Sequence, residues 1–125
     1  VPLALKIAPD LDRNEITSIA KAITRNDFDG VIATNTTLTR SDVEGLHHSD
    51  EAGGLSGEPL FKRANQVLDC LRQCLDPSIP IIAVGGIMSA KDAQKKLAIG
   101  ADLVQIYTGF VYKGPKLIKD IVLKI

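Results

Sequence analysis

The chain alternates between short apolar runs and longer segments in which apolar residues recur every three or four positions. The short runs are rich in aliphatic residues, as strands are, whereas the longer segments have the period of helices with one buried face. The pattern predicts four strands, at 3–7, 31–34, 81–84 and 103–107. The clearest apolar faces of the intervening helices are formed by Ile16, Ile19, Ala20 and Ile23, by Ala64, Val67, Leu68, Leu71 and Leu75, and by Leu117, Ile118, Ile121, Val122 and Ile125.

Polar residues, glycine and proline mark the ends of these helices. Asp12 is a suitable N-cap, and Glu15, three residues later, completes a capping box. Ser89 predicts the start of the third helix in the same way, and Gly100 predicts its end. Pro115 predicts the start of the last helix, because proline is favoured in the first turn.

The order of elements is strand then helix, four times over, in one domain that spans residues 1–125. The predicted fold class is therefore α/β, with a parallel sheet whose strands are buried on both faces. Each unit takes about 30 residues, the spacing of a TIM barrel, in which eight such units occupy about 250 residues. Four consecutive βα units would form half of a TIM barrel. A doubly wound sheet is the structural alternative.

Positive and negative side chains balance, since Lys+Arg and Asp+Glu both total 15. A neutral chain has no broad attraction to nucleic acid or an anionic membrane, so any bound anion must be held by local donors. No apolar run approaches the roughly 20 residues that span a bilayer, and we expect a soluble chain. Cys70 and Cys74 lie on one predicted helix, and no further Cys/His pair indicates a metal site. The only methionine is Met88, which indicates either a processed chain or a piece of a longer protein.

Polar residues gather at the carboxyl ends of the predicted strands, where parallel β/α proteins bind their ligands. Lys6 lies inside the first apolar run, where its ammonium group needs a partner. Its side chain either extends to the rim of the sheet or pairs with an anion, and we favour a bound anion. The Thr34-Asn35-Thr36-Thr37 segment is either a polar turn or a set of groups that face a polar ligand.

Two glycine-containing segments are candidates for anion binding. Gly85 and Gly86 follow the third strand and allow the backbone to approach a ligand closely. The helix predicted from Ser89 would then direct free N–H groups at a phosphate. The Gly53–Gly57 segment is either a flexible loop or a set of amides around an anion. The remaining paired charges and histidines are expected to be exposed to solvent: His47 and His48, Lys62 and Arg63, and Lys95 and Lys96.

Five of these motifs together resemble the class 2 dihydroorotate dehydrogenases, which are quinone-linked and membrane-associated. The resemblance covers the whole chain and matches the C-terminal half of that family's barrel. The motifs are Lys6-Ile7-Ala8-Pro9-Asp10-Leu11, Thr34-Asn35-Thr36-Thr37, Gly53-Gly54-Leu55-Ser56-Gly57 with Pro59-Leu60, Val84-Gly85-Gly86-Ile87, and Val104-Gln105-Ile106-Tyr107-Thr108 with Lys113-Gly114-Pro115.

The resemblance implies a TIM barrel that holds FMN at the carboxyl ends of its strands. It implies FMN contacts for Lys6, near the pyrimidine edge of the flavin, and for Thr34. It implies contacts with the substrate for Asn35 and Thr36. The remaining cofactor-binding residues that it implies, mostly around the FMN phosphate, are Gly57, Gly85, Gly86, Tyr107 and Thr108.

The activity that the resemblance implies is oxidation of (S)-dihydroorotate to orotate in pyrimidine biosynthesis, with quinone as electron acceptor. The family's catalytic base is a serine in the N-terminal half of the barrel. No residue here matches its motif, and we assign that role to neither Ser41 nor Ser56. The N-terminal region that binds quinone has no counterpart here either, and the whole protein would lie peripherally on the cytoplasmic side of the inner membrane.

A half barrel has two unpaired sheet edges. We therefore expect this chain alone to be inactive and prone to association, with the N-terminal half of the barrel as its partner. Two other functions stay open. An isomerase or lyase that binds phosphate should carry acid/base carboxylates at its strand ends, where only Asp10 is found. A non-catalytic half-barrel scaffold would need no buried Lys6.

Overall fold

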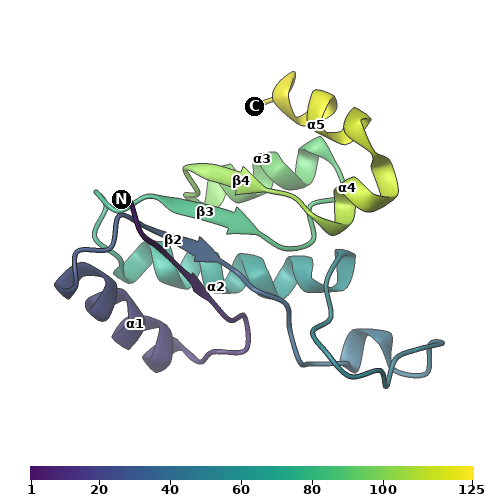
Figure 1. Ribbon diagram of the computed structural model, residues 1–125, viewed down its shortest axis with the longest axis horizontal. Coiled ribbons are helices and arrows are strands. Elements are labelled where there is room, and N and C mark those ends of the chain that lie inside the picture. The colour runs from purple at the N-terminus through teal and green to yellow at the C-terminus, as the bar shows by residue number, and fades with distance from the viewer.

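The computed structural model describes all 125 residues and contains one parallel sheet of four strands. The strands are β1 (Ala4–Ile7), β2 (Gly30–Ala33), β3 (Ile81–Val84) and β4 (Leu103–Gln105). They lie side by side in the order β1-β2-β3-β4, which is also their order in the sequence (Figure 1). All four predicted strands are confirmed, with bounds that differ by at most two residues at either end.

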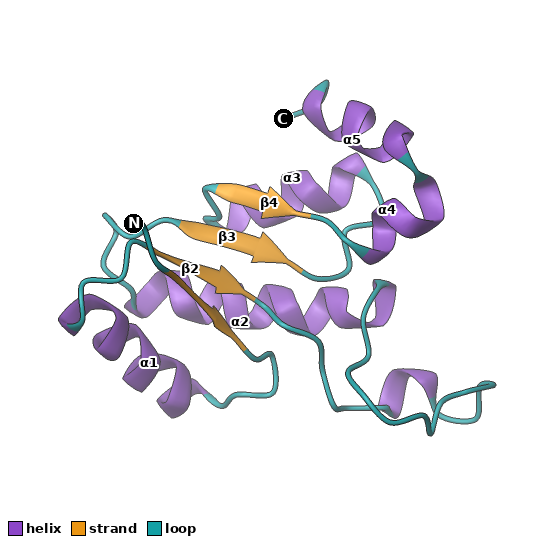
Figure 2. Ribbon diagram, in the orientation of Figure 1, coloured by secondary structure: helices purple, strands orange, loops and turns teal.

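Five helices accompany the sheet: α1 (Arg13–Arg25), α2 (Phe61–Cys74), α3 (Ala90–Ile99), α4 (Thr108–Lys113) and α5 (Pro115–Val122). Two short 3₁₀ helices, η1 (Ser41–Val43) and η2 (Glu58–Leu60), lie in the long connection between β2 and α2. Helices α1, α2 and α3 all lie on one side of the sheet (Figure 2). A doubly wound sheet has helices on both faces and a reversal in its strand order. The sequential order with helices on one side is that of half a TIM barrel.

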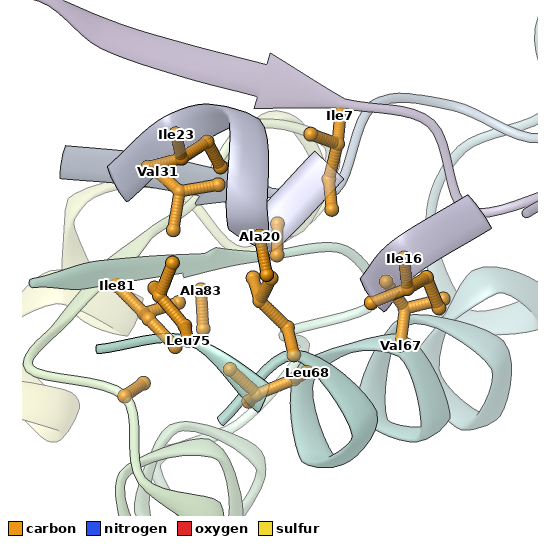
Figure 3. Packing of buried hydrophobic residues seen from close by; sticks show 13 residues of the cluster. Ile7, Ile16, Ala20, Ile23, Val31, Val67, Leu68, Leu75, Ile81 and Ala83 are labelled. Carbon is orange, nitrogen blue, oxygen red and sulfur yellow. The ribbon is translucent and has the colours of Figure 1, made fainter. Parts of the chain in front are cut away.

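The main core lies between the sheet and the first two helices (Figure 3). Ile16, Ala20 and Ile23 of α1 pack there with Val67 and Leu68 of α2 and with strand residues such as Val31 and Ile81. Each fully buried aliphatic side chain of this kind contributes about 1.5–3 kcal/mol relative to an exposed one. A smaller cluster, around Ala93 of α3 and Leu117 and Ile121 of α5, joins the end of the chain to the sheet.

The predicted helix ends agree with the structure. Asp12 accepts a hydrogen bond from the Glu15 N–H at 2.9 Å, and the Glu15 carboxylate accepts one from the Asp12 N–H at 2.7 Å. Ser89 caps α3, Gly100 ends it with a φ of 121°, and Pro115 begins α5. Helix α4 has no counterpart in the prediction, because its six residues are too few to show a helical period.

The prediction that the strands are buried on both faces is wrong for this chain. The helices cover one face only, and side chains on the other face are half-buried or exposed, such as Ile82, Val84 and Leu103. On α5, Leu117 and Ile121 are buried, whereas Ile118 and Val122 are exposed and line an apolar groove beside β4. None of the helices is long and apolar enough to span a membrane.

The prediction that Lys96 lies on an exposed helix face is also wrong. Its side chain is fully buried between α3 and α2, while Lys95 beside it is exposed. The Lys96 Nζ atom donates to Asn65 Oδ1 at 2.8 Å and lies 5.1 Å from the centre of the Phe61 ring. Burial lowers the pKa of Lys96 to about 8, although the charge of Asp92 acts in the opposite direction.

Candidate functional site

A cavity of about 240 Å³ opens at the carboxyl ends of the four strands. Every candidate site residue named from the sequence lines it: Lys6, Thr34, Asn35, Thr36, Gly57, Gly85, Gly86, Tyr107 and Thr108. Ligand pockets in proteins enclose roughly 300–1,000 Å³. The smaller volume here agrees with a cavity whose walls come from half of a barrel.

Lys6 reaches the cavity from β1. Side chains alternate along a strand, so Lys6 points to the face opposite buried Ile7, which is the face that no helix covers. The expectation of a buried ammonium group is wrong for this reason, since Lys6 is exposed in this chain. Its ammonium group forms no ion pair and no hydrogen bond within the chain, and is therefore available to bind an anion.

The segment after β2 supplies the most polar wall of the cavity. Thr34 follows a cis peptide bond after Ala33, and only 1% of it is exposed. Its hydroxyl donates to the Asn35 carbonyl oxygen at 2.9 Å. The Asn35 Oδ1 atom accepts from the Thr36 N–H at 3.0 Å, and both residues are exposed to the cavity mouth. Asn35 and Thr36 thus keep side-chain donors that a polar ligand can use.

The Gly85-Gly86 turn lines the cavity beside this segment, since β3 is the neighbour of β2 in the sheet, and it contains no Cβ atoms. Gly86 has a φ of 73° and lies against the first residue of α2, where a Cβ would come within 2.5 Å of Phe61 Cα. The backbone N–H groups of Gly57, Gly85 and Gly86 have no acceptor within the chain. Free amides around a concave surface are typical of a site for an anion such as phosphate.

The helix that directs its N-terminus at the cavity is α4, and the prediction that α3 does so is wrong. Ser89, Ala90 and Lys91, at the start of α3, do not line this cavity. Ser89 Oγ instead accepts from the Asp92 N–H and caps the helix. Tyr107, Thr108 and Gly109, where α4 begins, line the cavity without a side-chain cap. A short extra helix after the last strand is a common part of phosphate sites in TIM barrels.

Several lining residues were assigned no contact with a ligand from the sequence: Ser56, Leu60, Val84, Ile87, Gln105, Ile106 and Gly109. The sequence could have identified Gln105, because a polar residue between two apolar residues of a strand points to the face opposite theirs. Ser56 joins the rim, where its hydroxyl accepts from Thr108 Oγ1 at 2.9 Å. This bond links the loop before α2 to the start of α4.

Asp10, the only carboxylate near these strand ends, does not line the cavity. Its two carboxylate oxygens accept from Thr37 Oγ1 at 2.5 Å and from the Leu38 N–H at 2.8 Å. Partial burial acts to raise the pKa of Asp10, but these hydrogen bonds and the charge of Arg63 outweigh it, so the pKa is lowered. The cavity therefore contains donors and one cation but no acid/base carboxylate. No group of three or more His, Cys, Asp or Glu side chains is arranged to hold a metal ion.

A sequential parallel sheet with a donor-lined cavity at its carboxyl ends defines a ligand-binding protein of the TIM-barrel class. The model of the dihydroorotate dehydrogenase family matches residues 1–125, and this chain belongs to that family.

Two curated relatives carry the name dihydroorotate dehydrogenase (quinone). The protein of Shewanella loihica is 61% identical over 122 residues, which cover 98% of this chain and 36% of the relative. The protein of Paraburkholderia phymatum is 59% identical over 120 residues, which cover 96% of this chain and 35% of the relative. The chain thus spans about a third of the length of the relatives it matches.

Solved structures of the family share the fold. The Eimeria tenella enzyme in complex with ferulenol superimposes with a TM-score of 0.92 at 35% identity, over 98% of this chain and 33% of that one. The ligand-free form of the same enzyme gives a TM-score of 0.91. The match indicates that the four βα units adopt here the arrangement that they have within a complete barrel.

Proposed function

We propose that this chain is the flavin-holding half of a quinone-dependent dihydroorotate dehydrogenase. The whole protein would oxidise (S)-dihydroorotate to orotate with quinone as electron acceptor, a step of pyrimidine biosynthesis. The observation that carries the proposal is that all four strand ends meet around a single cavity, three of them with polar side chains and that of β3 with Gly85 and Gly86. The names of the relatives support the substrate and the acceptor.

The cavity fits the phosphate end of FMN by its donors and its shape. Gly57, Gly85 and Gly86 would hold the phosphate through free N–H groups, beside the uncapped start of α4 at Tyr107 and Thr108. Glycine is needed at positions 85 and 86 because a Cβ there would collide with Leu60 or Phe61, and it keeps this turn packed against the start of α2. When bound, FMN supplies the two-electron acceptor that the oxidation requires.

The remaining lining residues would act on the flavin ring and the substrate. Lys6 would stabilise negative charge at the pyrimidine edge of the ring, because its ammonium group has no other partner. The buried Thr34 would contact the flavin from the end of β2. Asn35 and Thr36, at the mouth of the cavity, would hydrogen-bond the dihydroorotate ring and fix its orientation.

The base that takes the substrate proton would lie in the N-terminal half of the barrel, outside this chain, and the same half would close both sheet edges. The apolar groove beside β4 supports this, because exposed Leu103, Ile118 and Val122 would be buried by neighbouring barrel elements. Quinone is a lipid-soluble acceptor, which supports a peripheral position for the whole protein at a membrane; its place on the cytoplasmic side of the inner membrane is what the family resemblance implies.

A full-length chimaera tests the proposal, in which these 125 residues replace the matching segment of the Shewanella loihica relative. We expect the chimaera to reduce a soluble quinone in the presence of dihydroorotate. Asn35→Ala should impair the reaction, whereas Asn14→Ala, on the exposed face of α1, should not. A folded chimaera that reduces no quinone would contradict the proposal and favour the isomerase, lyase or scaffold function instead.

A further inference from the structure

The long connection between β2 and α2 narrows to a neck directly beside the cavity. Thr37 and Leu55 pair there as an isolated antiparallel bridge, with N–H to carbonyl distances of 3.0 and 2.7 Å. Thr36 and Gly54, the residues that precede the two bridge residues, pack so closely that no Cβ fits at position 54. Residues 35–36, which line one wall of the cavity, lead into the neck on its outgoing side. The returning side of the neck leads to residues 56–57, which line a second wall. The geometry of the neck therefore sets the distance between the two walls.

Asp10 fixes the outgoing side of this neck. It follows β1 and holds both the Thr37 hydroxyl and the Leu38 N–H with its two carboxylate oxygens. The Thr37 hydroxyl also accepts from the Thr39 N–H at 3.0 Å, which orients it toward the carboxylate. Hydrogen bonds to an ionised acceptor are about twice as strong as neutral ones. Asp10 thereby anchors the neck to the first strand of the sheet.

Arg40 joins the outgoing side of the neck to the returning side. Its Nη1 atom donates to the Thr37 carbonyl oxygen at 3.2 Å. Its Nη2 atom donates to the carbonyl oxygens of Glu51, at 3.3 Å, and Gly53. The planar guanidinium group can span both segments at once, which a lysine cannot do. The side chain is half-buried and forms no ion pair.

We propose that Asp10 and Arg40 are positioning residues that hold the two cavity walls at their working separation. Asp10 directly contacts only the segment that follows Asn35 and Thr36, whereas Arg40 contacts that segment and also the segment that leads to Ser56 and Gly57. The inference rests on the proposed function, in which the first wall contacts dihydroorotate and the second contacts the FMN phosphate. It assigns no step of the reaction to either residue.

Amide hydrogen exchange of the 125-residue chain tests the neck without flavin or activity. The N–H groups of Thr37 and Leu55 are both held across the bridge, so their exchange reports its opening. Arg40→Ala should raise both rates by about tenfold or more, as expected for the loss of charge-assisted hydrogen bonds. Arg25→Ala, an exposed arginine without a side-chain hydrogen bond, should leave them unchanged. Unchanged rates in Arg40→Ala would overturn the inference.

Kinetics of the chimaera test which wall each residue positions. Asp10→Asn places an amide donor against the Thr37 hydroxyl or the Leu38 N–H, and should raise the KM for dihydroorotate about tenfold while the FMN Kd stays unchanged. Arg40→Ala should raise both constants. Asp50→Asn, an exposed carboxylate in the same loop, is the matched control.

The positioning roles assigned to Asp10 and Arg40 are wrong if both variants alter kcat alone. They are also wrong if Asp10→Asn weakens FMN binding as much as Arg40→Ala does. A wild-type chimaera that binds no FMN would overturn the proposed function instead. The exchange rates of Thr37 and Leu55 would in that case still decide whether Arg40 holds the neck.

Discussion

Gly86 lies directly against Phe61, the first residue of α2, with room for no side chain between them: a Cβ at position 86 would come within 2.5 Å of Phe61 Cα. The glycine also has a φ of 73°, a conformation that costs other residues about 1–2 kcal/mol. The contact explains why the turn after β3 brings bare backbone to the cavity. It also fixes the start of α2 beneath the proposed phosphate site.

Gly86→Ala should therefore weaken FMN binding by the chimaera by at least about tenfold, because the turn must shift to accommodate the methyl group. The FMN Kd, measured by quenching of flavin fluorescence, reports the effect. Gly45→Ala is the matched control, since Gly45 has a similar φ of 78° but nothing within 4 Å of the added Cβ. Equal FMN Kd values in the two variants would mean that the Gly86 turn does not touch the cofactor.

Lys6→Ala should slow the reduction of bound flavin by dihydroorotate by about tenfold or more, through loss of a cation near developing negative charge. The melting temperature of the 125-residue chain should stay unchanged, because Lys6 is exposed there and has no partner within the chain. Stopped-flow absorbance of the flavin in the chimaera gives the rate, with Lys21→Ala on the exposed face of α1 as control. A wild-type reduction rate in Lys6→Ala would refute the assigned role.

Lys96 makes the stability of the chain depend on alkaline pH. Burial lowers its pKa from 10.5 to about 8, so between these values the unfolded chain binds more protons than the folded chain. The free energy of unfolding should therefore rise with pH over this range, by roughly 3 kcal/mol at most. Lys96→Met should lack this contribution, whereas the exposed Lys95→Met should retain it.

Urea unfolding of the wild type and both variants at pH 7.5 and pH 10 isolates the effect of Lys96, because other groups that titrate in this range cancel in the comparison. If Lys96→Met and Lys95→Met showed the same dependence on pH, burial would not lower the pKa of Lys96.

Ser89→Ala should lower the free energy of unfolding by about 1 kcal/mol, the usual effect of losing an N-cap. The Ser89 hydroxyl accepts from the Asp92 N–H at 3.2 Å and donates to the Asp92 carboxylate at 2.8 Å. Ser18→Ala, at an exposed position of α1 without a side-chain hydrogen bond, should change stability little. Urea unfolding measures both, and an equal loss would mean that the cap contributes nothing.

The sequence predicted the features that depend on near neighbours. The period of Ile16, Ala20 and Ile23 identified a helix face that is buried, and Ser89 and Asp12 identified helix starts. The strand-end rule identified the cavity, because parallel strands bring their carboxyl ends to one edge wherever the helices lie.

The predictions for Lys96 and Lys6 were wrong because burial depends on contacts between residues far apart in the sequence. Lys96 is buried because Asn65, 31 residues away on α2, offers its Oδ1 atom, and nothing beside Lys96 in the sequence indicates that partner. Lys6 is exposed because the face of β1 that it occupies has no cover in this chain, although its neighbours are as apolar as those of a buried strand. Helix α4 was missed because six residues between Tyr107 and Gly114 are too few for a periodic pattern.

The flavin content of the purified chimaera tests the central claim most directly, that this cavity is half of an FMN site. The flavin absorbance, set against the protein concentration, should give about one FMN per chain, and Gly86→Ala should lose the flavin on dilution where Gly45→Ala retains it. A folded chimaera that contains no flavin and takes up none from added FMN would contradict the account.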